Sequence, residues 1–165
     1  MSAQACLSQI ASETELDLSI ISISNEFLEV LALREFEVEI KYYSETLQSM
    51  VSESNWKSMN EHLDAQLNMN RPIYQPHSLT YYQQGNLLAA VDIMADVSPE
   101  FYVCGYLLWE IKESGTELLR VEQNVVNKAA MLQIDVGTAA QLMTNMRCPT
   151  QVIETMLNIR IAPNN

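Results

Sequence analysis

The chain has 165 residues, 48% of them hydrophobic, which suits one globular domain with a real core. Its 21 acidic and nine basic side chains give a net charge of −12, and such a surface repels nucleic acid and anionic membrane. We therefore expect no direct contact with nucleic acid and no membrane association. The three cysteines form no C-x-x-C pair, so structural zinc and a disulfide framework are both unexpected, and a reduced, cytoplasmic setting fits best.

Residues 1–11 are weakly patterned and predict a loose arm, with a short helix as the alternative. An apolar stripe with steps of three and four residues then runs from Ile20 to Met50 and predicts one long amphipathic helix. Phe27 and Leu33 lie on this stripe, so an aspartate at either position should unfold or disassemble the protein. The stripe consists of Ile20, Ile23, Phe27, Val30, Leu33, Phe36, Ile40, Tyr43, Leu47 and Met50.

Part of this stripe also alternates with period two, because apolar residues from Phe36 to Tyr42 are separated by Glu37, Glu39 and Lys41. Alternation of this kind is typical of a strand. We prefer a helix, since the three-four stripe continues through the disputed part. A second helix is expected from Asn55 to Leu67, followed by a loop over 68–78 that contains two prolines.

The segment 79–94 can form a short helix or a hairpin around Gly85-Asn86, and the helix is preferred. Ser98-Pro99-Glu100 has the composition of a helix start, and apolar residues at helical spacing continue to Met131. Two shorter helices are expected over 138–145 and 149–157. The predicted fold is one all-α domain over 1–165, a helical bundle with a long N-terminal helix or helical hairpin packed on C-terminal helices. The alternative is an α+β fold with a short hairpin near 79–94.

Chemical signatures are missing from the sequence. It contains no G-x-G-x-x-G, Walker, G-x-S-x-G or H-E-x-x-H motif, and its only histidines are His62 and His77. We expect no catalytic residues, no metal, no cofactor and no enzymatic activity. Cys104 lies in an apolar run and is expected to be a buried, inert thiol, whereas Cys148 before Pro149 is expected to be the more exposed one.

The acidic residues are unevenly distributed, and this distribution indicates interaction surfaces. Residues 1–64 carry a net charge of −9, whereas the stretch Ala65–Val91 (the acid-free window) has no acid and Arg71 as its only base. Aromatic residues and arginine are enriched in the cores of interfaces. The candidate interface residues are Glu35, Glu37 and Glu39 on the acidic helix face, and Arg71, Tyr81 and Tyr82 in the acid-free window.

The function predicted from these features is a non-enzymatic protein–protein interaction module (an adaptor, chaperone or inhibitor-like protein) that acts through acidic and apolar helix faces. Its expected partners are a protein, a basic one being favoured by the charge, and further copies of itself in a homo-oligomer. One alternative is a structural subunit of a larger assembly, such as a capsid, tail or secretion filament. The other is an acidic mimic of nucleic acid that inhibits a DNA- or RNA-binding protein.

Overall fold

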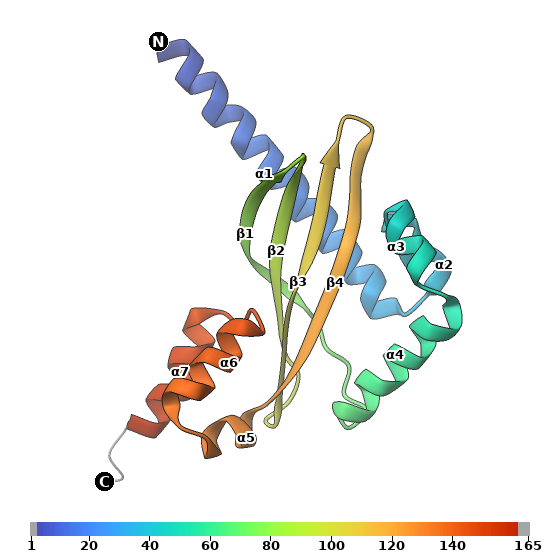
Figure 1. Cartoon of the computed structure of the whole chain (residues 1–165). Coiled ribbons are helices and arrows are strands. Elements are labelled where there is room, and N and C mark those ends of the chain that lie inside the picture. The colour runs from blue at the N-terminus through green and yellow to red at the C-terminus, as the bar shows by residue number, and fades with distance from the viewer. Residues whose placement is uncertain (1–2, 162–165) are drawn as a thin grey trace.

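The computed structural model describes the backbone of residues 3–161 and the side chains of residues 15–158. Helices precede and follow one antiparallel sheet (Figure 1). The elements are α1 (Ala3–Leu33), α2 (Phe36–Glu39), the 3₁₀ helix η1 (Ile40–Tyr42), α3 (Glu45–Met50), α4 (Glu53–Gln66), β1 (Gln75–Gln84), β2 (Asn86–Asp96), β3 (Phe101–Lys112), β4 (Gly115–Asn127), α5 (Lys128–Gln133), α6 (Val136–Asn145) and α7 (Thr150–Ile161). The fold is therefore α+β, and the predicted all-α helical bundle is wrong. The alternative hairpin near 79–94 is present as β1 and β2.

The four strands form a meander in the order β1-β2-β3-β4, with each neighbouring pair antiparallel. Gly85 (φ +75°) forms the turn between β1 and β2, and Gly115 (φ +140°) begins β4 after the turn from β3. Both glycines adopt backbone conformations that side chains with a Cβ rarely reach. The hairpins explain why the two glycines interrupt the apolar runs.

The predicted helix from Ser98 to Met131 is instead a turn followed by two strands, and only its end, from Lys128, is helical as part of α5. The amides of Val97 and Ser98 both donate to the carbonyl of Phe101, which closes the turn between β2 and β3. Along β3, alternate residues such as Phe101, Val103 and Leu107 are buried on the same face of the sheet. Serine and proline are as common in turns as at helix starts, so the local signal was correct about a boundary and wrong about the element that follows.

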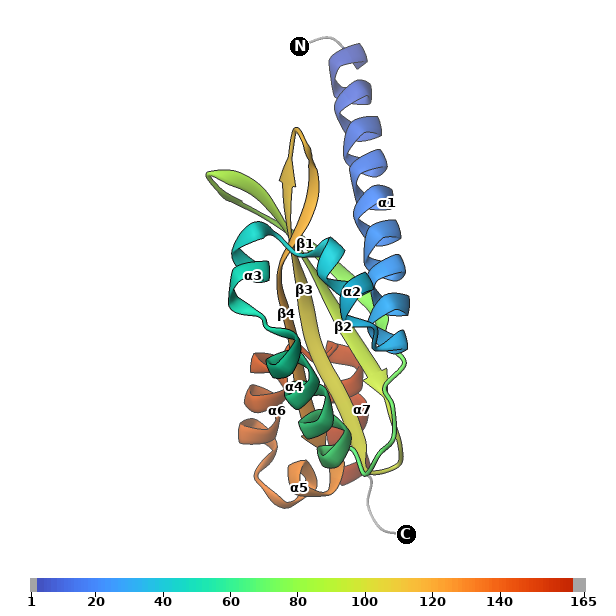
Figure 2. The same cartoon turned by 90° about the vertical axis from the view of Figure 1, so that its right-hand side faces the viewer.

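Helix α1 covers one face of the sheet, as Figure 2 shows. Its buried side chains include Ile20, Phe27 and Leu31, which pack in one cluster with residues of all four strands. The Phe27 ring meets the ring of Trp109 on β3 edge-on, with centroids 5.9 Å apart. The Trp109 indole nitrogen donates to the buried Ser24 hydroxyl over 2.9 Å, so the polar atom of this core tryptophan is satisfied.

The predicted continuous helix from Ile20 to Met50 is wrong, because α1 ends at Leu33 and Arg34 adopts a left-handed conformation (φ +59°). The Arg34 guanidinium makes two hydrogen bonds to Asp64 on α4, of 2.8 and 3.0 Å, which hold this reversal of the chain. Leu33 is 62% exposed and Met50 72% exposed, so neither belongs to the buried face. Residues 36–42 are helical as predicted, but in two short pieces after the break.

Helix α4 is the predicted second helix, and it begins earlier than expected, since the Ser52 hydroxyl caps it by accepting from the amide of Asn55. β1 begins at Gln75, within the segment predicted as a loop over 68–78. Residues 3–11, the part of the arm predicted over 1–11 whose backbone is described, are helical and form the beginning of α1, whereas Met1 and Ser2 lie outside the described residues.

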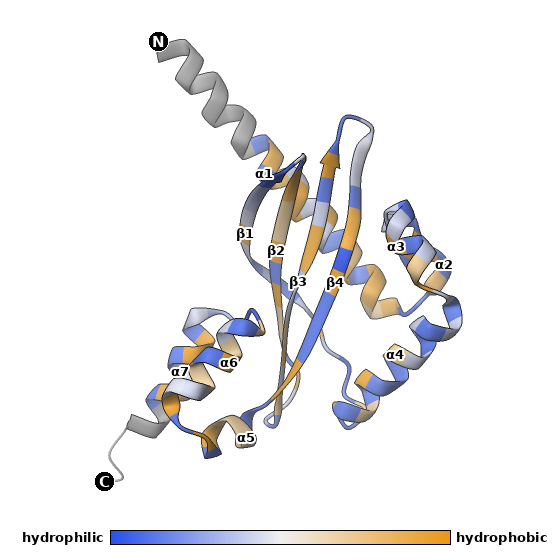
Figure 3. Cartoon of the chain, viewed as in Figure 1, coloured by the Kyte–Doolittle hydropathy of each residue, from blue (hydrophilic) through white to orange (hydrophobic). Residues whose placement is uncertain are grey.

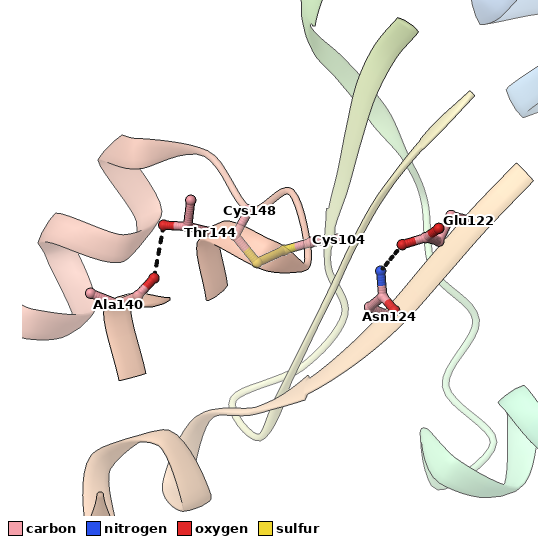
Figure 4. Close-up of a disulfide and its surroundings, with 6 residues drawn as sticks. All are labelled: Cys104, Glu122, Asn124, Ala140, Thr144 and Cys148. Atoms are coloured by element: carbon pink, nitrogen blue, oxygen red, sulfur yellow. Dashed lines mark hydrogen bonds between the residues drawn. A yellow bond between two sulfur atoms is a disulfide. The ribbon is translucent and has the colours of Figure 1, made fainter. Parts of the chain in front are cut away.

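Helices α6 and α7 are the two predicted C-terminal helices, and they cover one end of the sheet face opposite α1. A disulfide between Cys104 on β3 and Cys148, in the turn between these helices, joins them to the sheet (Figure 4). The expectation of free thiols at both positions is wrong, and Cys148 is buried instead of exposed. Hydrophobic residues are concentrated on β2 and β3 (Figure 3), which separate this C-terminal cluster from the core under α1.

Candidate functional site

The three glutamates predicted as one acidic face do not share a face. Glu35 and Glu37 are exposed at the start of α2, whereas Glu39 is only 3% exposed. The break after Leu33 rotates α2 away from the line of α1, which turns Glu39 inward. The prediction that Glu39 contributes to a solvated acidic surface is therefore wrong.

Two aromatic side chains bind the Glu39 carboxyl. The Tyr43 hydroxyl donates to its Oε1, and the indole nitrogen of Trp56 on α4 donates to its Oε2 over 3.0 Å. Burial raises the pKa of Glu39, although both hydrogen bonds and the charge of Arg34 act in the opposite direction. Burial and the neighbouring carboxyl together raise the pKa of Tyr43, so its hydroxyl keeps its proton and remains a donor.

Glu39 and its two partners line a cavity of about 260 Å³ between α3, α4 and β4, called here the α4 cavity. Its walls are mostly apolar and include Leu47 and Val121. The sequence contained one signal for the Glu39–Tyr43 contact, the spacing of four residues, which places two side chains on one side of a helical segment. Nothing in the sequence indicated that Trp56 joins them.

The residues predicted in the acid-free window also separate. Arg71 lies exposed in the segment before β1, while Tyr81 and Tyr82 point to opposite faces of β1 because successive strand residues alternate. Tyr81 faces α1, and its hydroxyl donates to Asp17 over 2.5 Å. Tyr82 faces the other side and is 40% exposed.

Helices α6 and α7 leave part of this sheet face uncovered (Figure 1), and this part is called here the open sheet face. Tyr82 borders a shallow hollow of about 240 Å³ on it. Its lining residues are Tyr82, Gln84, Leu88, Ala90, Tyr106, Leu108 and Arg147. Leucine, tyrosine and arginine side chains of this kind offer apolar contact area with polar ends, which suits a protein interface better than catalysis.

Arg147 fixes the border between the open sheet face and the C-terminal helices. It follows α6 in a left-handed conformation (φ +65°), and its Nε donates to Asp92 on β2 over 2.7 Å. Its guanidinium also lies over the Tyr106 ring, 5.1 Å from the centroid. No sequence pattern connects Arg147 with Asp92, because the contact spans 55 residues and depends on the sheet.

The two edges of the sheet differ in how they are covered. At β4, the amide of Ser44 donates to the carbonyl of Leu118 over 2.8 Å, so part of this edge is already paired. β1 pairs only with β2 among the described strands. Its segment Ser78–Gln84, called here the β1 edge, contains no charged residue.

Within residues 15–158, no group of three or more His, Cys, Asp and Glu side chains could hold a metal ion. Over the described helices, none is long and apolar enough to cross a membrane. Comparison with known proteins gave no match to a family model, to a curated protein or to a solved structure.

Proposed function

We propose that this protein is a non-enzymatic structural subunit that pairs with a second copy of itself through the β1 edge. The observation that carries the proposal is an uncharged edge strand, which pairs with β2 alone among the described strands, in a chain whose net charge is −12. Two copies related by a two-fold axis would join their sheets by antiparallel pairing of β1 with β1.

An edge strand can offer backbone donors and acceptors to another chain, and proteins usually protect such edges with charges, prolines or bulges. Here Pro76 and a bulge between Pro76 and Ser78 protect only the beginning of β1. The rest of the strand is rich in residues that favour strands, including Thr80, Tyr81 and Tyr82. It therefore has the features of a pairing strand.

Charge selects the second copy as the partner at this edge. Two copies with a net charge of −12 repel each other, and the repulsion is weaker at an edge that carries no acid of its own, where the adjacent Asp17 and Asp92 accept hydrogen bonds from Tyr81 and Ser78. The acid-free window contains the whole β1 edge. Partial burial lowers the pKa of the adjacent His77, which disfavours a positive charge at the contact.

The open sheet face extends this contact from backbone to side chains. Tyr82 on β1 adjoins Leu88 and Leu108 on the neighbouring strands, and all three line the shallow hollow. A partner strand beside β1 would place its own side chains next to this apolar surface, which gains free energy in proportion to the area buried.

Sedimentation velocity tests the proposal on the wild-type chain and on Thr80→Glu, which puts a carboxylate on the exposed side of the β1 edge. Like charges directly opposite each other destabilise strand pairing, so we expect the dimer to weaken about tenfold or more. Gln133→Glu adds the same charge at an exposed position of α5 and should leave the dimer intact. A wild-type monomer at roughly 50 μM, a permissive concentration, would overturn the proposal.

Salt separates this proposal from the other candidate functions. Self-association of an acidic chain should strengthen as salt screens the repulsion between copies. Binding to a basic protein through Glu35 and Glu37, or inhibition of a nucleic-acid-binding protein by mimicry, should weaken under the same change. A dimer that dissociates with rising salt would therefore contradict pairing through the uncharged edge.

The disulfide between two of the cysteines bears on where in the cell the protein works. Disulfides persist mainly in oxidising compartments, and the Cys104–Cys148 bond therefore favours an assembly outside the reducing cytosol over the cytoplasmic location expected from the cysteine count.

A further inference from the structure

We infer that the α4 cavity binds an organic ammonium ion, with the Glu39 carboxylate as its counter-ion and the Trp56 and Tyr43 rings as its aromatic contacts. The inference does not depend on the proposed self-association, because the cavity lies at α3, α4 and β4, away from the β1 edge (Figure 1).

Glu39 is a buried acid without a cation bound to it among the described residues. Among the described residues, no ion pair includes Glu39, and the nearby Arg34 guanidinium is already bound by Asp64. A buried carboxylate without an opposite charge is costly, so proteins normally pair it. A ligand that brings a positive charge would supply the missing partner.

The Glu39 carboxyl can still accept further hydrogen bonds. Its hydrogen bonds with Tyr43 and Trp56 use one acceptor site on each oxygen, whereas an ionised carboxylate has about four such sites. These two donors also fix the orientation of the group, so a bound cation would meet a pre-organised oxygen pair. Glu39 is itself among the residues that line the cavity.

Two aromatic side chains, Trp56 and Tyr43, also line the α4 cavity. An ammonium group over the face of tryptophan or tyrosine is attracted by the ring, and tryptophan binds it best. The Phe36 ring packs 5.6 Å from the Trp56 ring and holds it in place from outside the cavity. Carboxylate, tryptophan and tyrosine in one apolar cavity are therefore complementary to an ammonium ion that carries alkyl groups.

Size and charge narrow the class of ligand. A volume of about 260 Å³ is near the lower limit of small-molecule sites and fits a head group with a short chain. The net charge of −12 concentrates cations near the surface and disfavours anionic ligands. The apolar walls formed by Leu47, Val51 and Leu63 favour a cation with methyl groups over a strongly hydrated inorganic ion.

The test is a titration of the full chain with choline. NMR spectra monitor the binding through the indole N–H signals of the two tryptophans. The neutral carbon isostere of choline, dimethylbutanol, is the matched control ligand. Choline should shift the Trp56 signal in a saturable way and leave the fully buried Trp109 signal in place. Dimethylbutanol should bind about tenfold more weakly or worse, because it lacks the charge.

Two variants assign the effect to the carboxyl. Glu39→Gln keeps the shape of the side chain and removes its charge, so choline should bind about tenfold more weakly or worse while dimethylbutanol is unaffected. Glu37→Gln removes one charge from an exposed position of the same helix and should change neither affinity. Equal binding of choline and dimethylbutanol to the wild-type chain would overturn the inference, whatever the folding of the variants. Undiminished choline binding by a folded Glu39→Gln variant would also overturn it.

An ammonium group can come from a free small molecule or from a methylated lysine of another protein. A short peptide with one trimethyllysine distinguishes these sources in the same experiment. Tighter binding of the peptide than of choline would assign the cavity to a protein side chain. Tighter binding of choline than of the peptide would assign it to a free small ammonium ion. No saturable shift with either probe would refute the inference.

Discussion

Removing the disulfide between Cys104 and Cys148 should weaken the protein substantially, and the effect can be estimated from its position. The bond joins residues 44 apart in the sequence. Cross-linking a loop of that length restricts the unfolded chain and is worth about 4 kcal/mol in the chain-entropy model. Both cysteines are buried, so replacing them by alanine also leaves a small void between β3 and the C-terminal helices.

Urea unfolding measures this contribution. In a Cys6→Ser background, which removes the third cysteine, the Cys104→Ala/Cys148→Ala variant should lose about 4 kcal/mol of unfolding free energy relative to the Cys6→Ser parent. Reducing the parent should give a loss of similar size. Hydrogen exchange should quicken first in α6 and α7, because their cluster is separate from the core under α1.

Two results would refute this reasoning. Thiol titration of the denatured, unreduced Cys6→Ser parent should find no free thiol, and two free thiols would show that the bond does not form. If the bond forms but its reduction changes the unfolding free energy by less than about 1 kcal/mol, well below the chain-entropy value, it does not stabilise the attachment of the C-terminal helices.

The remaining predictions concern the core under α1, the buried acid Glu39 and the close approach of β3 to β4 at Gly105. Phe27→Ala should cost about 3–5 kcal/mol in urea unfolding, whereas Leu33→Ala should be nearly neutral because Leu33 is exposed; equal losses would contradict the placement of α1. Glu39→Gln should raise the melting temperature at pH 7. Because the pKa of Glu39 is raised, its ionisation lowers the free energy of unfolding at pH 7, and this loss disappears below its ordinary pKa of 4.5, so the gain should vanish near pH 4; a gain independent of pH would exclude this cause. Gly105→Ala should destabilise the sheet by about 1–3 kcal/mol or more, because a Cβ there would lie 1.7 Å from the carbonyl oxygen of Glu122; an unchanged urea midpoint would refute the close approach.

Capping residues and spacing together predicted the two C-terminal helices, although the same two signals at Ser98–Glu100 preceded a strand instead. Asp135 caps α6 through the amide of Thr138, and the helices over 138–145 and 149–157 are present as expected. The sheet was missed because a strand buried on both faces has a nearly continuous apolar run, in which helical spacing can also be found. β3 is such a strand, with Cys104 buried on one face and Leu107 on the other.

The candidate site was predicted only in part, for the same reason. Tyr81 and Tyr82 were grouped on sequence proximity, but the strand places them on opposite faces, and only Tyr82 reaches the open sheet face. Glu39 was assigned to the surface because the left-handed turn at Arg34 could not be foreseen from a stripe that continues through it. The role of Arg147 depends on contacts across the sheet that no local pattern contains.

The disulfide also determines how this chain would respond to a pulling force. Tension applied to the C-terminal helix passes through Cys148 directly to Cys104 on β3, so the residues between them carry no load. The sheet must then yield at an interior strand, where β3 is paired on both sides, and cannot be peeled from β4 at its edge. Reduction would release this shielded segment, whose two cysteines lie 44 positions apart, and add roughly 150 Å of extensible chain. The chain should therefore be short and stiff while oxidised, and become extensible when reduced.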